Sequence, residues 1–209
     1  MTYPASLSGD MTLTLPEFAD PPADPVALLR NWLGEAEAAG VREPRTATFS
    51  TADAGGRVSA RTVLIKELAD HGLLIGFSEG SRKGRDIVGN PHAAVTFYWR
   101  ERAQQIVICG RIDKAPDAVS DRIFLTRPPS ARALATVSAQ SQPTTALRAL
   151  RQAVAEAEQT EDLRRPASWS AWLLHYDELE FWHGSPDRFH RRLYYRRVGD
   201  HFVSSRLQP

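Results

Sequence analysis

The sequence predicts a mainly β fold, an antiparallel barrel with helices at its periphery. Several runs alternate between apolar and polar residues, and short turns with Gly or Asp separate most of them. Segments with a helical period are inserted near the start of the chain and between residues 117 and 159. Because short turns join neighbouring strands in antiparallel order, these observations favour a meandering sheet that closes on itself.

The composition limits the possible classes of function. Of the 209 residues, 42% are hydrophobic and 24% are charged, as in ordinary globular proteins. The formal net charge is +1, so we expect neither nucleic acid nor a membrane as a partner, and any basic site must be local. Cys109 is the only cysteine and the six histidines lack a metal-ligand spacing, so neither a disulfide nor a metal site is expected. No apolar run approaches the ~20 residues of a membrane span, and we expect a cytoplasmic protein.

The chain is expected to consist of a flexible arm and one domain. Residues 1–21 mix Ser, Thr, Gly and Pro without a sustained period and predict the arm. The domain would span residues 22–209. It begins with a helix that Asp24 caps, with Pro25 at the first helical position, and that ends at Gly40.

The other elements follow from the period of the apolar residues. Further helices are expected at residues 117–125, 130–138 and 144–159, the last with Leu147, Leu150 and Val154 facing inward. The strands are expected at residues 46–51, 58–66, 73–77, 93–99, 104–114, 169–182, 191–196 and 201–206.

A basic turn at residues 80–85 predicts a phosphate site. Ser81 is placed to cap a short helix, whose first backbone N–H groups are free to face an anion. Arg82 and Lys83 follow at the same end, where cations are unfavourable unless an anion neutralises them. A solvated basic turn is the alternative. Gln104 and Gln105 open a strand and are suited to binding the edge of a heterocycle, although a polar strand end is equally common.

Residues 181–197 hold five arginines and two histidines against one carboxylate. If the segment is extended from Arg188 onward, then Arg188, His190 and Arg192 share one face. Such a face can bind a planar anion through its guanidinium groups, with an imidazole able to move a proton. The alternative is a solvated basic strand with its aromatic residues in the core.

Three runs together resemble the pyridoxamine 5'-phosphate oxidase family. They are residues 61–66, residues 81–85 and residues 181–192. Gln105, Arg127 and the pair Gln140 and Ser141 fall where that family places such residues. The resemblance covers residues 22–209.

The resemblance implies a split β-barrel homodimer with FMN at the subunit interface. Arg61, Arg82 and Lys83 would hold the FMN phosphate. The implied cofactor-binding residues are Arg61, Thr62, Val63, Leu64, Lys66, Gly76, Phe77, Ser81, Arg82, Lys83, Gln105, Gln140, Ser141, Trp182 and Arg192. The implied substrate-binding residues are Lys66, Ile123, Arg127, Ala131, Arg188 and His190, of which Arg188 and His190 carry the catalytic roles of orientation and proton handling.

The sequence departs from the vitamin B6 enzymes of that family at the substrate phosphate. Those enzymes have a tyrosine four residues before the Arg-Pro and a serine four residues after that arginine, where this chain has Ile123 and Ala131. Residues 1–22 contain no arginine and so lack the Arg-x-x-Tyr element of the B6 enzymes. Losing two hydrogen bonds to a charged group would cost about 3–6 kcal/mol of binding.

Several stretches are similar instead to the FMN-dependent oxidases of phenazine biosynthesis within that family, among them residues 22–33, 40–45 and 98–106. This similarity implies oxidative aromatisation of reduced phenazine carboxylic acid precursors, with dioxygen as acceptor and a small aromatic carboxylate as substrate. At position 66 this chain has the lysine that is typical of the vitamin B6 enzymes, so a pyridoxamine/pyridoxine 5'-phosphate oxidase is the first alternative. A non-catalytic split-barrel protein that binds flavin or haem is the second.

Overall fold

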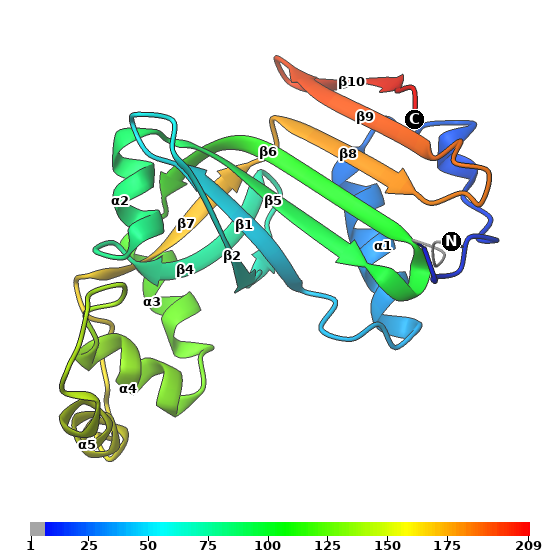
Figure 1. The fold of residues 1–209 in the computed structure, drawn as a ribbon. Helices are drawn as coiled ribbons and strands as arrows, with labels where there is room; N and C mark the ends of the chain where they lie inside the picture. Colours follow the sequence, from blue (N-terminus) through cyan, green and yellow to red (C-terminus); the bar gives the residue numbers. More distant parts are fainter. Residues whose placement is uncertain (1–6) are drawn as a thin grey trace.

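The structure is a computed structural model that describes residues 7–209 (Figure 1). Its helices are α1 (Pro25–Ala38), α2 (Arg82–Gly89), α3 (Asp117–Leu125), α4 (Pro129–Val137) and α5 (Leu147–Glu158), with 3-10 helices η1 (Pro16–Phe18) and η2 (Arg100–Arg102). Its strands are β1 (Thr46–Ala52), β2 (Val58–Leu64), β3 (Glu67–Leu68), β4 (Gly72–Ser78), β5 (His92–Trp99), β6 (Gln104–Lys114), β7 (Trp169–His175), β8 (Glu178–His183), β9 (Arg191–Val198) and β10 (His201–Arg206).

The strands form a single antiparallel sheet that bends around a core. Its main path runs β10–β9–β8–β6–β5–β1–β2, while β3 and β4 join it through β7, which pairs with β6. Every strand pair is antiparallel, as the short turns predicted. The predicted mainly β fold with peripheral helices is therefore confirmed.

Strand β6 changes partner along its length, and this change splits the barrel. Its residues 104–109 pair with β8, and its residues 112–114 pair with β7. At Gly110, between these two parts, a side-chain carbon would come within 2.2 Å of the His175 carbonyl oxygen. The carboxylate of Asp177 accepts a hydrogen bond from the Arg111 N–H at 2.8 Å. The single strand predicted over residues 169–182 is thus two strands, because the chain turns at Tyr176 and Asp177 as β6 changes partner.

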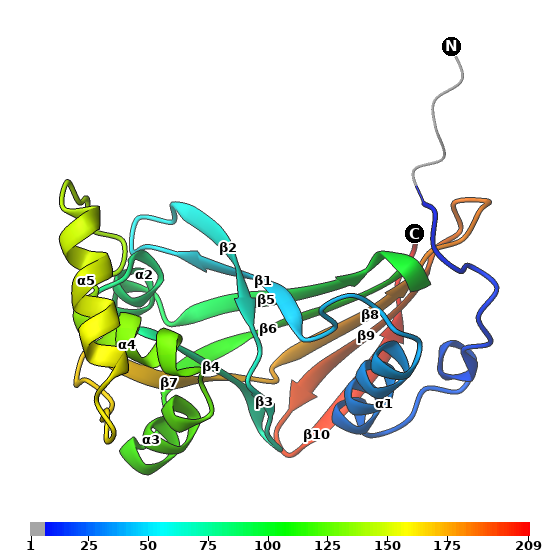
Figure 2. The same ribbon diagram turned by 90° about the horizontal axis from the view of Figure 1, so that it is seen from below.

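Helix α1 covers the inner side of the sheet formed by β6, β8 and β9 (Figure 2). It begins as predicted, since Asp24 accepts hydrogen bonds from the N–H groups of Val26 and Ala27 at 2.8 and 3.1 Å. Its buried Trp32 packs edge-on against Phe181 of β8, with ring centroids 5.2 Å apart. The main hydrophobic core lies between this helix and the sheet.

Helices α3, α4 and α5 lie together at the other end of the molecule (Figure 2). The inner face of α3 joins residues of β4 and β7 in a second, smaller core. Helix α5 begins later than predicted and has no buried residue. Leu147 is 59% exposed. Together with Leu150 and Val154 it lines a groove against α4, so these residues face inward as predicted, but toward α4 and not toward either hydrophobic core.

The segment before α1 packs against the C-terminal strands. Residues 1–6 of the predicted arm lie outside the described residues. Leu15 and Phe18 are buried, and Nε of Arg206 donates to the Phe18 carbonyl oxygen at 2.7 Å. The prediction of a flexible arm over residues 1–21 is therefore corrected around η1, because its apolar side chains bury against β9 and β10.

Candidate functional site

A pocket of about 580 Å³ opens between strands β2 and β4, helix α2 and helix α4. Ten of the predicted site residues line it: Arg61, Thr62, Val63, Leu64, Lys66, Gly76, Phe77, Lys83, Arg127 and Gln140. Ala131, predicted on the substrate side, also lies in the wall. The residues that the sequence did not indicate are Ser78, Pro128, Leu134, Ala135, Ser138 and Trp169.

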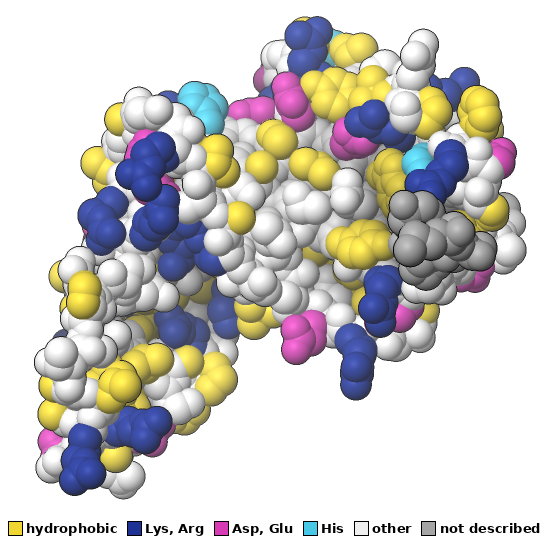
Figure 3. Space-filling view, viewed as in Figure 1, with side chains coloured by type: hydrophobic (Ala, Val, Ile, Leu, Met, Phe, Trp, Pro, Cys, Tyr) yellow, Lys and Arg dark blue, Asp and Glu magenta, His cyan; other side chains and the backbone are white. Residues whose placement is uncertain are grey.

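The pocket concentrates positive charge. Four of its lining residues are the cations Arg61, Lys66, Lys83 and Arg127, and no Asp or Glu occurs among the described residues that line it. Figure 3 shows Lys and Arg side chains gathered around the hollow between α2 and the α4–α5 pair. Because like charges in a partly buried site repel one another, this arrangement favours binding of an anion.

Arg61 is held rigidly at one side of this pocket. Its guanidinium donates to the Phe49 carbonyl oxygen at 3.1 Å and to Oγ1 of Thr51 at 2.8 Å. Its Nη2 lies 3.8 Å from Asp86, which also accepts hydrogen bonds from Thr51 and Ser59 at 2.7 Å each. Burial lowers the pKa of Arg61, and Asp86 acts in the opposite direction. The network therefore fixes the position of the guanidinium, while the lowered pKa means that a bound anion would still stabilise its charged form.

Lys83 enters the same site from α2. Its side chain is buried, and Nζ lies 5.3 Å from the centre of the Phe77 ring. Nζ donates to Oε1 of Gln140 at 3.3 Å. Burial, followed by the charge of Arg61, lowers the pKa of Lys83 to about 8. A bound anion would restore the ordinary pKa, so a phosphate would stabilise the charged form of Lys83.

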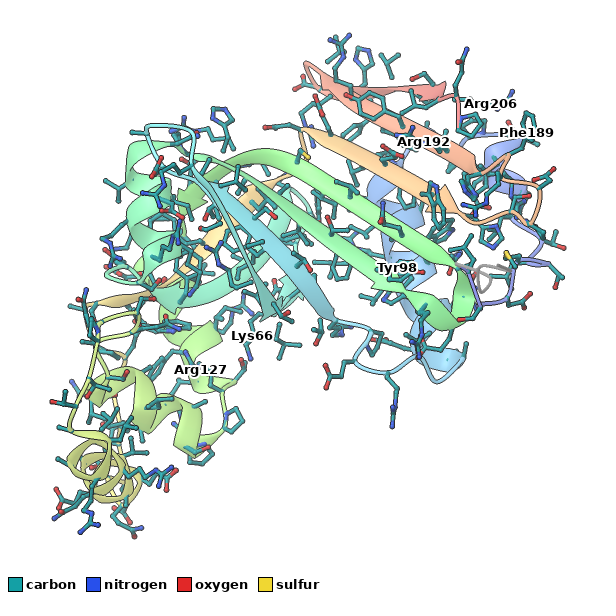
Figure 4. The ribbon with its side chains drawn as sticks, in the orientation of Figure 1. Lys66, Tyr98, Arg127, Phe189, Arg192 and Arg206 are labelled. Atoms are coloured by element: carbon teal, nitrogen blue, oxygen red, sulfur yellow. The ribbon has the colours of Figure 1, made fainter. Side chains whose placement is uncertain are left out.

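Lys66 and Arg127 form the opposite side of the pocket, and Figure 4 shows them next to each other. Burial and then the charge of Arg127 lower the pKa of Lys66. Burial also lowers the pKa of Arg127, whose guanidinium donates to the Ala131 carbonyl oxygen at 2.8 Å and lies 5.0 Å from the Trp169 ring. Two unneutralised cations at this end would suit a second anionic group, distinct from the one at Arg61 and Lys83.

A glycine and a tryptophan shape the pocket floor. A side-chain carbon on Gly76 would come within 2.2 Å of the Trp169 ring. The ring lies across Gly76 because β4 and β7 pair in a register that places Gly76 opposite Ala171. A glycine within an apolar strand indicates such a close approach, which is the one sequence signal for this contact.

The start of α2 binds a segment that is distant in sequence. Ser81 is buried and caps the helix as predicted, with its hydroxyl accepting from the Gly84 N–H at 3.4 Å. The Arg82 N–H donates to Oγ of Ser141 at 3.2 Å. The side chain of Arg82 is exposed and lies outside the pocket lining. Ser81 and Arg82 therefore lie next to the pocket residue Lys83 without lining the pocket, and their predicted contacts with a cofactor stay a prediction.

Ile123 does not line the pocket, which corrects its prediction as a wall of the substrate site. It is 2% exposed and lies in the second core with Phe124 and Trp169. The reason is helical spacing, because Ser120, Ile123 and Phe124 form the buried face of α3.

A second group of predicted residues lies on strands β6, β8 and β9. Gln105 lies opposite Trp182, and Trp182 lies opposite Arg192, so their side chains share one face of the sheet. Arg192 donates to both carboxylate oxygens of Glu180, at 2.6 and 2.9 Å, and this contact raises the pKa of Arg192. Glu180 therefore orients the guanidinium, a role that the sequence did not indicate.

The loop before β9 carries the two predicted catalytic residues. Nδ1 of His190 accepts from the Ser185 N–H at 3.0 Å, and its ring lies 4.9 Å from the ring of Trp182. Arg188 is exposed and has a left-handed backbone with φ of 68°. The expected common face of Arg188, His190 and Arg192 is therefore wrong, because the extended strand begins only at Arg191.

The two groups of site residues lie far apart within one chain. Figure 4 shows Arg192 and Phe189 at one end of the sheet, and Lys66 and Arg127 at the other. Thus one chain brings together the pocket residues but not the whole set that the sequence predicted.

The sequence matches two family models, which together cover most of the chain. The model described as "Pyridoxamine 5'-phosphate oxidase" matches residues 33–161. The chain belongs to the pyridoxamine 5'-phosphate oxidase family. A second model, "Pyridoxine 5'-phosphate oxidase C-terminal dimerisation region", matches residues 169–209, which include Trp182 and Arg192.

Curated relatives fall into two functional classes. The chain is 42% identical to a dihydrophenazinedicarboxylate synthase from Pseudomonas chlororaphis, an alignment that covers 98% of this chain and 92% of the relative. It is also 42% identical to a pyridoxine/pyridoxamine 5'-phosphate oxidase from Burkholderia lata, over 91% of this chain and 92% of the relative. Identity alone therefore does not separate the two activities.

The fold agrees with that of solved members of the family. The crystal structure of PhzG from Burkholderia lata, in complex with tetrahydrophenazine-1-carboxylic acid, has a TM-score of 0.93 and 36% identity. That match covers 96% of this chain and 100% of the solved one. The split β-barrel that the resemblance implied is therefore confirmed. None of the helices within residues 7–209 has the length and apolar character needed to span a membrane.

Proposed function

We propose that this protein is an FMN-dependent oxidase that aromatises reduced phenazine carboxylic acids in phenazine biosynthesis, with dioxygen as the electron acceptor. The observation that carries this proposal is the pocket with four cations and no carboxylate among its described lining residues. It is supported by the relatives named dihydrophenazinedicarboxylate synthase, of which the one from Burkholderia lata is 36% identical over 98% of this chain.

The donor set of the pocket fits FMN. Arg61 is half-buried and Lys83 is buried, both carry lowered pKa values, and both would bind the phosphate dianion. Gln140 and the backbone near Val63 and Leu64 lie beside them and would contact the rest of the cofactor. When bound, FMN supplies the redox centre that accepts two electrons from a substrate and passes them to dioxygen, with formation of hydrogen peroxide.

A homodimer would complete the site. Arg192 lies at the opposite end of the sheet from the pocket residues Lys66 and Arg127 (Figure 4), and the strand register places Trp182 and Gln105 beside Arg192. The sheet between these groups presents an outer face with few charges, where Thr62, Thr48 and Thr96 lie side by side and Tyr98 is 48% exposed (Figure 3). A second copy packed on this face would bring its Trp182 and Arg192 to the pocket of the first.

The substrate-side residues suit a carboxylate on a broad ring system. Arg127 and Lys66 would bind the carboxylate, and Trp169 and Leu134 provide apolar walls for the rings. Ala131 leaves space where the B6 enzymes have a serine. Arg188 and His190, from the partner, would orient the substrate, and His190 would hold or move a proton at Nε2 because its Nδ1 is already bonded to the Ser185 N–H.

Oxidation of pyridoxamine 5'-phosphate is the second candidate, and Lys66 favours it. The two functions are separated by peroxide release from the purified holoprotein with either substrate in air. We expect release with reduced phenazine carboxylates. Release with pyridoxamine 5'-phosphate alone would assign the protein to the B6 enzymes. Absence of flavin absorbance, even after addition of FMN, would contradict both oxidase functions and leave the non-catalytic alternative.

A further inference from the structure

A buried histidine and an arginine meet at the base of the loop that carries Arg188 and His190. His183 ends β8 and Arg191 begins β9, and the two residues lie opposite each other in the strand register. Nη2 of Arg191 lies 2.8 Å from Nδ1 of His183, which is 0% exposed. The contact therefore closes the loop of residues 184–190 at its base.

Two hydrogen-bond partners determine which ring nitrogen of His183 carries the proton. A guanidinium can only donate, so Nδ1 of His183 must accept from Arg191 and the ring must be neutral, with its proton on Nε2. Nε2 lies 3.1 Å from the carbonyl oxygen of Asp10 and donates to it. Arg191 also donates to the Leu13 carbonyl oxygen at 3.2 Å, and its guanidinium lies 5.2 Å from the Phe18 ring. The pair thus reaches from the loop to the N-terminal segment.

The N-terminal segment fits closely between the loop and the turn at η2. The Asp10 N–H donates to the Glu101 carbonyl oxygen at 2.9 Å. A side-chain carbon on Gly9 would lie 2.0 Å from the Arg100 carbonyl oxygen, and one on Gly184 would lie 2.9 Å from Leu7. The Gly184 N–H donates to the Ala103 carbonyl oxygen at 2.9 Å. Both glycines therefore allow contacts that a side chain would block.

We propose that His183 and Arg191 are positioning residues, which fix the loop of residues 184–190 by bonding it to residues 10–13. Neither residue lines the pocket, so they would act through Arg188 and His190 and not on the substrate directly. The consequence for turnover rests on the proposed function, but the bonding of the loop to the N-terminal segment does not.

The charges around His183 favour its neutral form. Burial lowers the pKa of His183, and the charges of Arg191 and of Arg102 from η2 lower it further. The Asp10 carbonyl and carboxylate act in the opposite direction. If Nδ1 of His183 is protonated, it can no longer accept the hydrogen bond from Arg191. Acidic pH should therefore break the contact between the two residues.

The test compares His183→Leu, His183→Gln and wild type as FMN-loaded protein. Gln can accept from Arg191 and donate to Asp10, whereas Leu can do neither. Hydrogen exchange, followed by mass spectrometry, reports peptides covering residues 8–14 and 184–190. We expect exchange in both peptides to rise by about tenfold in His183→Leu and to remain near wild type in His183→Gln. The exposed turn residue His71, changed to Leu, is the matched control and should change neither peptide.

Measurement of turnover then distinguishes a positioning role of His183 from a purely structural one. In His183→Leu we expect KM for reduced phenazine carboxylate to rise several-fold with FMN content unchanged, and His183→Gln to restore it. Unchanged exchange in both peptides would overturn the proposal, as would raised exchange with an unchanged kcat/KM. If wild type oxidises no phenazine, the proposed function fails while the exchange data still decide whether the pair fixes the loop.

A second measurement covers the case in which His183→Leu does not fold. Wild-type exchange, corrected for the intrinsic rate at each pH, should rise in both peptides between pH 7.5 and pH 5.5, because the released histidine has an ordinary pKa of about 6.5. Equal corrected exchange at the two pH values would overturn the proposal.

Discussion

Nζ of Lys83 and Oε1 of Gln140 lie 3.3 Å apart and join two segments that are 57 residues apart in the sequence. The bond brings the start of α2 against the segment after α4, and it leaves the ammonium group at the pocket surface. Gln140 is neutral, so the amide oxygen satisfies one donor of Lys83 without neutralising its charge. An anion is therefore still required for the ordinary pKa of Lys83.

FMN affinity should fall at alkaline pH. In the free protein the pKa of Lys83 is lowered to about 8, and the bound phosphate should raise it again. The affinity gained from the ammonium is thus fully present below pH 8 and is lost as the pH rises through 8. Titration of the apoprotein with FMN should show Kd constant near pH 7 and rising by up to about tenfold per unit above pH 8.

Lys83→Arg is the matched variant for this titration, since its guanidinium stays charged throughout. Its Kd should stay flat from pH 7 to pH 9. If wild type and Lys83→Arg gave the same pH dependence, titration of Lys83 would not control the affinity.

Gly76→Ala should damage the pocket floor. The new Cβ would lie 2.2 Å from the Trp169 ring, which must shift within a packed core. We expect a loss of about 1–3 kcal/mol in the free energy of unfolding, measured by urea denaturation, together with weaker FMN binding. Gly80→Ala is the control, because within residues 7–209 no atom other than those of Gly80 and its chain neighbours lies within 4 Å of its Cβ position. A similar loss there would refute the packing argument.

Ala131→Ser should raise activity on pyridoxamine 5'-phosphate. Ala131 lines the pocket beside Arg127, so a hydroxyl there would face the substrate's anionic group. A hydrogen bond to a charged group is worth about 1.5–3 kcal/mol, which predicts about tenfold or more in kcat/KM for that substrate. No gain would show that this position does not contact the phosphate. Ile123→Tyr should instead unfold or destabilise the protein, since Ile123 lies in the core.

Mixed dimers should recover activity from two inactive variants. Lys83→Ala removes a pocket residue, and Arg192→Ala removes a residue of the second group, which lies on strands β6, β8 and β9. If each site draws on both subunits, co-expression should give about a quarter of wild-type activity, because half of the dimers are mixed and each has one intact site. Homodimers of either variant should stay nearly inactive. No recovery in isolated mixed dimers would place both groups in the same subunit's site.

The sequence predicted much of the fold because its local signals agree with the tertiary structure. The period of two located the strands, and the caps at Asp24 and Ser81 lie where the helices begin. The basic turn at residues 81–83 contributes Lys83 to the pocket wall, whereas its predicted role as a phosphate site stays a prediction. Such signals depend on neighbouring residues, so no knowledge of the tertiary fold was needed.

Other features depended on contacts between distant segments. Trp169 meets Gly76 only because of the register between β4 and β7, and Ile123 is buried by the packing of α3 on β7. The alternation from Arg188 onward failed because the loop turns back through a left-handed residue before β9 begins. The separation of the pocket from Arg192 likewise reflects the path of β6 through the sheet, which no single segment encodes.

Anaerobic reduction of the bound flavin tests the central proposal most directly. The holoprotein is mixed without oxygen, in separate cuvettes, with a reduced phenazine dicarboxylate or with pyridoxamine 5'-phosphate, and the flavin absorbance is followed. We predict rapid bleaching by the reduced phenazine and recovery of the absorbance when air is admitted. Rapid bleaching by pyridoxamine 5'-phosphate, with none by the reduced phenazine, would contradict the proposed function.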